Sequence, residues 1–340
     1  MTDNQKEDAR KRLAAEWLTS LAPRYGLAVP SLAPASADAS FRRYFRVQGK
    51  DQSYIVMDAP SDREPIAPFV KVDGLMKEAG LHVPVLYETD ADKGFILMSD
   101  LGHQTYLDVL NETNAPRLFD AATDALVLWQ KASRPGVLPE YDAAVMSREI
   151  HLFTEWYVAR HRKFTLSQKQ SSVIEAVFDK IIAQNQSEEK VFVHRDFMPR
   201  NLMLSDPCPG VLDFQDALYG PVSYDIASLM RDAFISWDEE FVLDITIRYW
   251  DKARKAGIPV PKDFGVFWRN VEWMGIQRHL KVLGIFARIN YRDGKPKYLA
   301  DTPRFVRYVR QTANRYDELK PINWLLDCFE EEKLIQGYSY

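Results

Sequence analysis

The sequence predicts an α+β fold of two lobes, a small N-terminal β-sheet lobe followed by a larger, mainly helical lobe. The chain has 340 residues, a length at which a single hydrophobic core usually divides. Strand-like runs are concentrated before residue 100, and helical periodicity dominates after Gly102. Apolar residues make up 46% of the chain and charged residues 27%, which is typical of a folded globular protein. We therefore expect lobes over 1–99 and 100–340.

The first lobe is predicted to place one helix before a hairpin and a second helix before two more strands. Residues 5–21 have apolar side chains at helical spacing, and Pro23 and Gly26 then interrupt the pattern. The turn-forming residues 49–52 join two strand-like runs, which indicates a hairpin. The remaining predicted elements of this lobe are a loop over 31–40, strands over 41–47 and 53–57, a helix over 67–79, and strands near 83–88 and 94–98.

The second lobe is predicted to be helical, with one β-rich interval. That interval covers 191–219 and contains the short runs 191–193 and 210–212. The predicted helices lie near 116–132, 147–163, 169–185, 238–256, 263–289, 302–317 and 321–334.

Charge and cysteine content exclude several classes of protein. The net charge is -4, and no basic block of the kind that binds nucleic acid is present. Cys208 and Cys328 match no metal or redox spacing. The first residues lack the apolar run of a signal peptide, and no stretch approaches the roughly 18 apolar residues that span a bilayer. We expect a cytoplasmic protein, a monomer, that acts on a small molecule and not on nucleic acid or membrane.

The most informative motif lies in the β-rich interval. It has the form H-x-D-x-x-x-x-N, with His194, Asp196 and Asn201, and Asp213 follows the next strand-like run. This is the pattern of a kinase catalytic loop followed by a metal-binding aspartate. Phosphoryl transfer requires positioning and neutralised charge, so Asp196 is the predicted catalytic residue that orients the attacking hydroxyl. Asn201 and Asp213 supply the hard oxygen ligands that Mg²⁺ prefers. We expect His194 to brace the loop.

The residues after the motif point to the small-molecule branch of the protein-kinase-like fold. Asp213 is followed by Phe214-Gln215 in place of F-G, and a G-P-x-x-x-D-I-A run begins at Gly220. This resembles the aminoglycoside phosphotransferase and choline kinase superfamily. The resemblance implies that Asp225 supports the catalytic loop, although an ordinary helix N-cap is an equally good interpretation from sequence.

Further segments resemble a narrower family, the bacterial anomeric sugar kinases that phosphorylate N-acetylmuramate and N-acetylglucosamine. They are 37–46, 54–60, 97–102 and 155–157. The resemblance covers nearly the whole chain. It implies the use of ATP and Mg²⁺ to convert a free amino sugar to its α-1-phosphate in peptidoglycan recycling.

The nucleotide side departs from the usual kinase pattern. Met57 stands where a kinase strand carries its phosphate-binding Lys, and the following helix has no obvious partner Glu, since Glu64 precedes it and Glu78 lies near its end. Arg43 or Arg46 can replace the Lys, because guanidinium groups bind phosphate well. Equally, both arginines can simply flank an exposed strand.

The other residues of the nucleotide site are predicted from their positions in the sequence relative to the expected strands. Ser40 and Phe41 would form the turn over the phosphates. Backbone groups around Met98, Asp100 and Leu101 would hold adenine, with ordinary core packing as the alternative for Met98.

The predicted sugar contacts are polar groups near Asp196. They are Glu155, Gln215, Asp216 and Arg278, and an anionic lactyl group would face Arg195, Arg200 or Arg278. Two alternatives stay open from the sequence. One is a kinase for another hydroxylated acceptor, such as choline, homoserine or an aminoglycoside. The other is a weakly active nucleotide-binding module, which the missing strand Lys suggests.

Overall fold

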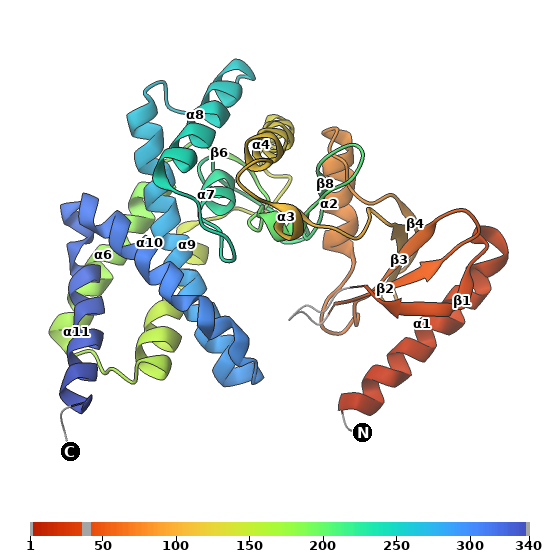
Figure 1. Ribbon diagram of the computed structural model, residues 1–340, viewed down its shortest axis with the longest axis horizontal. Coiled ribbons are helices and arrows are strands. Elements are labelled where there is room, and N and C mark those ends of the chain that lie inside the picture. Colours follow the sequence, from red (N-terminus) through yellow and green to blue (C-terminus); the bar gives the residue numbers. More distant parts are fainter. Residues whose placement is uncertain (1–2, 36–41, 338–340) are drawn as a thin grey trace. The chain divides into compact units, whose positions relative to one another are not determined.

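The computed structural model describes residues 3–35 and 42–337, with side chains over 9–35 and 42–329 (Figure 1). The chain forms two compact units. We call Met1–Val109 with Asn201–Asp216 the sheet unit, and Leu110–Arg200 with Ala217–Tyr340 the helical unit. The lobe limits expected from sequence, 1–99 and 100–340, stay a prediction about domains.

The sheet unit is built on a five-stranded antiparallel sheet in the order β1-β2-β3-β5-β4. Its strands are β1 (Ala28–Pro34), β2 (Arg43–Gln48), β3 (Ser53–Asp58), β4 (Leu86–Asp90) and β5 (Phe95–Ser99). The predicted hairpin is the pair β2–β3, closed where the Gly49 N–H donates to the Gln52 carbonyl at 2.8 Å. The loop predicted over 31–40 is wrong for 31–34, because pairing with β2 makes this segment an edge strand, where proline is tolerated.

Three helices and a small hairpin complete the sheet unit. Helix α1 (Asp3–Tyr25) packs Trp17, Leu18 and Leu21 against a sheet face that includes Val47 and Val56. Helices α2 (Ala67–Glu78) and α3 (Tyr106–Val109) follow. The hairpin of β7 (Leu202–Met203) and β8 (Gly210–Val211) joins this unit through bridges to residues 82 and 105.

The helical unit surrounds one long, buried helix. This is α9 (Phe264–Asp293), and it contacts α5, α6, α7, α8 and α10 as well as the π-helix η1 (Phe153–His161). A Cβ on Gly284 would lie 2.3 Å from the Leu152 carbonyl, so the close approach of α9 to η1 requires glycine there. The helix predicted over 147–163 is instead α5 (Ala143–Ile150) followed by η1, with the wider i to i+5 bond from the Arg162 N–H to the Tyr157 carbonyl.

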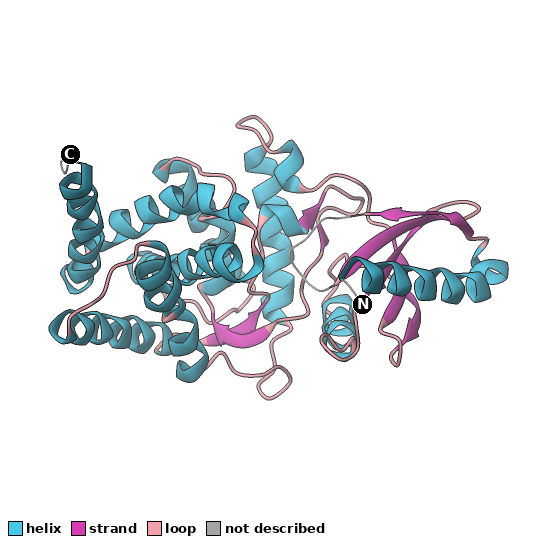
Figure 2. Cartoon of the chain, turned by 90° about the horizontal axis from the view of Figure 1, so that it is seen from below, coloured by secondary structure: helices cyan, strands magenta, loops and turns pink. Residues whose placement is uncertain are grey.

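The other predicted helices of the helical unit agree in type with the sequence pattern, whereas the helix over 224–230 and the 3-10 turns were not predicted. Strands β6 (Lys190–Val193) and β9 (Leu218–Pro221) form an antiparallel pair, visible as the short ladder among helices in Figure 2. The helices are α4 (Ala115–Lys131), α6 (Gln168–Gln186), α7 (Tyr224–Met230), α8 (Glu239–Lys255), α10 (Thr302–Arg315) and α11 (Lys320–Gly337), with 3-10 turns η2 (Pro199–Asn201), η3 (Pro296–Asp301) and η4 (Asp317–Leu319).

The predicted α+β class is confirmed, with a small antiparallel sheet before a mainly helical remainder. Within the part of the chain that the structure describes, no helix is both long and apolar enough to cross a membrane.

Candidate active site

The predicted catalytic loop follows β6 in the helical unit, and a buried carboxylate holds its first two amides. Asp225, in the first turn of α7, is fully buried. Its Oδ2 accepts the His194 N–H at 2.7 Å, and its Oδ1 accepts the Arg195 N–H at 3.0 Å. Burial raises the pKa of Asp225, while the charge of His194 and these two amide hydrogen bonds lower it, and the net shift is upward. The N-cap of α7 is Ser223, so Asp225 serves the loop and does not cap its own helix.

The residue before Asp196 has an unusual backbone conformation. Arg195 has φ of 78°, in the left-handed region, which costs a non-glycine residue roughly 1–2 kcal/mol. Three contacts fix it: its N–H donates to Asp225, its carbonyl accepts Arg278 Nη1 at 2.7 Å, and its guanidinium pairs with Glu149. Strain of this kind is found where a surrounding structure over-determines a functional loop. The position of Asp196 is thus set largely through its neighbour.

Glu149 on α5 is the anion at the centre of these contacts. Its side chain is 9% exposed, and it accepts hydrogen bonds from Lys281 Nζ at 2.9 Å and from the Tyr141 hydroxyl at 2.6 Å. Burial alone would raise the pKa of Glu149, but the charges of Lys281 and Arg195 outweigh it and lower the pKa to about 2. The carboxylate is therefore ionised at neutral pH and holds Arg195 in place.

His194 and Arg278 both lie under the loop. The imidazole of His194 is fully buried, its Nδ1 accepts the Asp196 N–H at 3.3 Å, and its ring meets Phe197 edge-on at 5.6 Å. Arg278 on α9 is 7% exposed, with its guanidinium 4.7 Å from the centre of the Tyr224 ring. These contacts orient the loop backbone. Because Arg278 is buried and donates to the Arg195 carbonyl, it is placed to position the loop.

The two predicted metal ligands lie at the open end of the β7–β8 hairpin in the sheet unit. The Leu212 N–H donates to the Asn201 carbonyl at 2.9 Å, and Asn201 Nδ2 lies 3.3 Å from Asp213 Oδ2. Asp213 has φ of 62°, a conformation that aspartate adopts more readily than most residues. The carboxylate of Asp213 and the amide oxygen of Asn201 are hard oxygen atoms of the kind that Mg²⁺ prefers, so the two residue types fit a magnesium ion.

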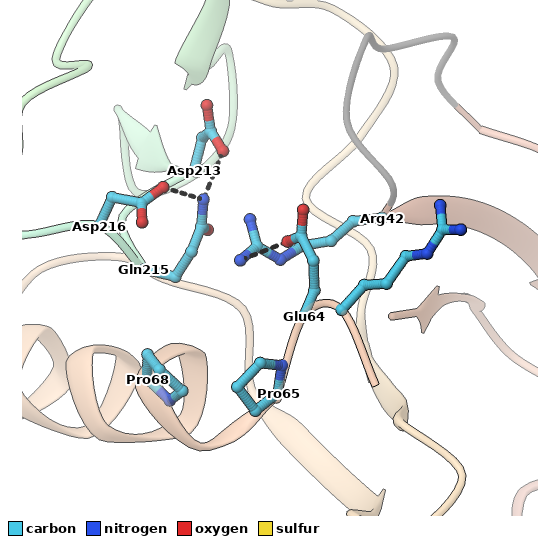
Figure 3. Close-up of a pocket in the computed structure, with 8 residues that line it drawn as sticks. Arg42, Glu64, Pro65, Pro68, Asp213, Gln215 and Asp216 are labelled. Carbon is cyan, nitrogen blue, oxygen red and sulfur yellow. Dashed lines mark hydrogen bonds and ion pairs between the residues drawn. The ribbon is translucent and has the colours of Figure 1, made fainter. Parts of the chain in front are cut away.

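A cavity of about 490 Å³ opens beside Asp213 within the sheet unit (Figure 3). The amide of Gln215 donates to Asp213 Oδ1 at 2.9 Å and is 3.4 Å from Asp216 Oδ2. Gln215 is 6% exposed, and its Oε1 is buried with no hydrogen-bond partner among the described residues. The cavity is lined by Arg42, Arg63, Glu64, Pro65, Pro68, Asp213, Gln215 and Asp216. It is therefore strongly charged, with groups of both signs.

Aromatic packing fixes the chain between Asp213 and Gln215. The ring of Phe214 is fully buried, and its centre lies 4.8 Å from that of Phe69 on α2. This contact ties the segment that carries Asp213 to the helix beside the cavity.

The two arginines predicted to bind phosphate are paired with aspartates of the sheet. Arg43 donates through Nε and Nη2 to Asp58 Oδ2 at 3.1 and 2.5 Å, and the Asp58 side chain is fully buried. Arg46 donates to the two oxygens of Asp100 at 2.5 and 3.0 Å. Neither arginine is among the described residues that line the cavity. In this structure both brace the sheet.

The other predicted nucleotide residues lie at the end of β5. Burial raises the pKa of Asp100, but hydrogen bonds from Arg46, the Ser53 hydroxyl and the Gly102 N–H outweigh it, so the net shift is downward. Met98 is buried in register with Ile55, and Leu101 follows, half-buried. Ser40 and Phe41 lie outside the described residues.

The four predicted sugar contacts divide between the two units. Gln215 and Asp216 line the cavity of the sheet unit. Arg278 lies under the catalytic loop of the helical unit, and Glu155 is exposed on η1 of the same unit. Of the arginines considered for a lactyl group, Arg200 lies over the ring of Phe234 at 5.0 Å.

Comparison with known proteins gives the family. A family model described as "Phosphotransferase enzyme family" matches residues 31–260. The chain belongs to this family. It is therefore an enzyme of the phosphotransferase class, as the catalytic-loop motif predicts.

Curated relatives within the family are closely similar over most of the chain. A protein of Pseudomonas aeruginosa named "N-acetylmuramate/N-acetylglucosamine kinase" is 53% identical over 94% of this chain and 97% of its own length. A protein of Neisseria meningitidis with the same name is 50% identical over 95% and 97%.

Solved structures share the fold at low sequence identity. The choline kinase LicA of Streptococcus pneumoniae has a TM-score of 0.61 at 15% identity, covering 89% of this chain and 99% of that one. The amicoumacin kinase hAmiN, solved with AMP-PNP and Ca²⁺, has a TM-score of 0.62 at 15% identity, covering 88% and 94%. At this identity the likeness concerns the fold alone.

Sequence reasoning did not assign Glu149, Arg42 or Glu64 to the site. Glu149 lies within an ordinary helical pattern, and nothing local marks it as the partner of Arg195. Arg42 stands beside two other arginines, and Glu64 precedes the helix in which a partner Glu is expected. The one available signal is the lack of a strand Lys, which requires a cation from elsewhere.

Proposed function

We propose that this enzyme is an ATP-dependent kinase that phosphorylates the anomeric hydroxyl of N-acetylmuramate and N-acetylglucosamine, giving the α-1-phosphate in peptidoglycan recycling. The observation that carries the proposal is the 50–53% identity, over nearly the whole chain, to relatives named for these two substrates. Choline, homoserine and aminoglycoside acceptors have weaker support, because likeness to choline and aminoglycoside kinases is limited to 13–16% identity.

Asp196 is the proposed catalytic residue. Its carboxylate accepts a hydrogen bond from the anomeric hydroxyl and so orients that oxygen toward the γ-phosphorus of ATP. The oxygen forms a bond to phosphorus, the bond from phosphorus to the bridging oxygen breaks, and ADP leaves with that electron pair. The hydroxyl proton passes to the Asp196 carboxylate and then to solvent. Asp225, Arg278 and Glu149 support the reaction by holding Arg195 and the loop amides.

Asn201 and Asp213 are the residues that would hold Mg²⁺. When bound, the ion neutralises charge on the phosphate oxygens. The protein's own contribution is to fix both side chains, through the β7–β8 hairpin and the packing of Phe214 on Phe69.

For the sugar, Gln215 and Asp216 are the proposed contacts nearest the metal-binding carboxylate, since both line the same cavity as Asp213. Glu155 is kept as a second-choice contact from the helical unit. For Arg278 we propose a positioning role, because it is buried and donates to the Arg195 carbonyl. Cytoplasmic location and a monomeric state remain predictions.

A substrate panel with a catalytic variant tests the proposal. The full chain, ATP and Mg²⁺ are incubated with N-acetylmuramate, N-acetylglucosamine, choline, homoserine or an aminoglycoside, and ADP and phosphorylated product are measured. We expect turnover with the two amino sugars and an acid-labile glycosyl phosphate as product. Asp196→Asn should lower kcat by 10²- to 10⁴-fold, whereas Asp179→Asn, on an exposed part of α6, should leave it unchanged.

Two outcomes would contradict the proposal separately. Faster turnover of choline or an aminoglycoside would exclude the substrate assignment and leave the kinase activity standing. Equal turnover by the parent and Asp196→Asn would exclude the role of Asp196.

A further inference from the structure

This inference rests on the proposed function and concerns the cationic side chain that binds the phosphates of ATP. Met57 occupies the strand position of the usual kinase Lys and is fully buried, paired in register with Tyr44 and Ile96. Arg43 and Arg46 are engaged with Asp58 and Asp100. A cation that meets the phosphates of ATP must therefore come from another position.

We propose that Arg42 is this cation and that Glu64 is its positioning residue. Arg42 Nη2 lies 2.6 Å from Glu64 Oε2, and both side chains line the cavity that also contains Asp213. Figure 3 shows the guanidinium of Arg42 pointing toward the side occupied by Gln215 and Asp213. The Arg42–Glu64 pair thus takes the part that a strand Lys and a helix Glu play in other kinases.

The geometry of the strands explains why Arg42, and not its neighbour, enters the cavity. Arg43 is the first residue of β2 and pairs in register with Asp58 of β3. Successive side chains at a strand leave the backbone on opposite sides. Arg42 comes immediately before this strand, and its side chain pairs with Glu64, in the loop that precedes α2, and not with Asp58.

Charge and burial support phosphate as the ligand. The side chains of Arg42 and Glu64 are 14% and 18% exposed, so their interaction is less screened than that of a surface pair. A guanidinium has five N–H donors in a planar fork that matches phosphate oxygens. Phosphate oxygens bound to a cation at Asp213 and to Arg42 would be neutralised from two sides of one cavity.

The cavity is also lined by Gln215, whose side-chain oxygen can accept a hydrogen bond from a ligand. Within the part of the chain that the structure describes, Gln215 Oε1 has no hydrogen-bond partner, and its side chain is only 6% exposed. A buried acceptor of this kind usually pairs with a donor. A sugar hydroxyl or a metal-bound water next to Asp213 is such a donor, and at about 490 Å³ the cavity has the size of a small-molecule site.

Nucleotide binding without sugar tests the inference. Binding of AMP-PNP with Mg²⁺, and of AMP, is measured calorimetrically for the full chain and for variants. The variants are Arg42→Gln, Arg42→Lys, Glu64→Gln, the double variant Arg42→Gln/Glu64→Gln, and Arg63→Gln. Arg24→Gln is the matched control, because Arg24 also pairs with a glutamate, Glu88, but on an exposed surface outside the cavity lining. Thermal unfolding confirms that each variant is folded.

The expected loss of affinity concerns the β- and γ-phosphates, which AMP-PNP has and AMP lacks. Arg42→Gln should weaken AMP-PNP binding by about 10- to 100-fold, the effect of losing charge-assisted hydrogen bonds, and leave AMP binding within about threefold. Arg42→Lys should retain part of the affinity. Glu64→Gln should weaken AMP-PNP binding by several-fold in the parent but not in the Arg42→Gln background, since a positioning residue acts through its partner.

Other outcomes would overturn the inference without deciding the substrate. Parental AMP-PNP affinity in a folded Arg42→Gln variant, or an equal loss for AMP and AMP-PNP, would exclude Arg42 as the phosphate cation. A loss in Arg63→Gln with none in Arg42→Gln would transfer the role to Arg63. If the amino sugars are not phosphorylated but AMP-PNP binding depends on Arg42, the substrate proposal fails and this inference stands.

Discussion

Replacing Asp225 by asparagine tests how the enzyme positions Asp196, the proposed catalytic residue. Each carboxylate oxygen of Asp225 accepts one backbone N–H, at 2.7 Å from His194 and 3.0 Å from Arg195. Asparagine has one oxygen, so in Asp225→Asn one amide meets an NH₂ donor and loses its acceptor. A hydrogen bond to a charged group contributes about 1.5–3 kcal/mol. Relief of the buried charge offsets part of this loss, and we expect the free energy of unfolding to fall by about 1–2 kcal/mol.

The catalytic effect should exceed the effect on stability. The left-handed conformation of Arg195 costs roughly 1–2 kcal/mol, an amount comparable to the hydrogen bond that is lost. With one amide released, the backbone before Asp196 can relax toward an ordinary conformation and displace the carboxylate. A displacement of about 1 Å can cost 10²-fold in rate. We therefore expect kcat to fall about 100-fold, with the KM for ATP changed by less than about threefold.

Steady-state kinetics and urea unfolding, measured on the same preparations, check this prediction. Asp73→Asn is the control, since Asp73 is a buried aspartate of the sheet unit whose pKa burial raises to about 7. That variant should keep its kcat. If Asp225→Asn loses stability as expected but retains kcat, Asp225 supports the fold only, and the argument that it positions Asp196 is refuted.

Two further predictions concern buried glutamates of the helical unit. Burial raises the pKa of Glu188 to about 8, against hydrogen bonds from Ser223 that lower it. The folded protein therefore retains this proton, and stability falls as pH rises from about 4.5 to about 8. Glu188→Gln should remove this pH-dependent decrease in stability, which is roughly 5 kcal/mol at most. If urea unfolding of the variant and the parent showed the same pH dependence, the prediction would be contradicted. Glu149, with its pKa lowered to about 2, contributes stability that is present above about pH 4.5 and lost as pH falls toward 2. Glu149→Gln should lower the free energy of unfolding by about 3–5 kcal/mol at pH 7, because it removes the carboxylate that pairs with Lys281 and Arg195. Adding Lys281→Met to that variant should restore part of the lost stability. If Glu149→Gln alone leaves the stability unchanged, Glu149 is not the ionised partner of these two cations.

The sequence predicted those parts of the fold and site that depend on local pattern. The hairpin of β2 and β3 follows from alternation and a turn signal, and the long helices follow from their apolar period. The Asp196, Asn201 and Asp213 spacing is also local, because one loop and one short hairpin carry all three residues. Their roles in catalysis and metal binding stay predictions until the variants are measured.

Contacts between distant segments could not be predicted in the same way. Residues 31–34 have loop-like composition but pair with β2, since an edge strand accepts proline. Three arginines stand within five positions of one another, and only tertiary contacts with Asp58, Asp100 and Glu64 distinguish them. The partner of Arg195 is Glu149, separated from it by 46 positions. No periodic signal links residues so far apart.

The division of the chain into two units runs through the catalytic motif, and each unit holds its own part of the proposed site. The boundary between the units falls between Arg200 and Asn201, inside the H-x-D-x-x-x-x-N motif. Asp196 is held from the helical unit by Asp225 and by the contacts of Arg195, whereas Asp213 is held from the sheet unit by its hairpin. The four residues between Asp196 and Asn201 connect these two supports covalently. Asp196 follows a residue in the left-handed region, Arg195, and Asp213 is itself in that region. Each unit thus has an unfavourable backbone conformation at or next to one of the two carboxylates that we propose for phosphoryl transfer.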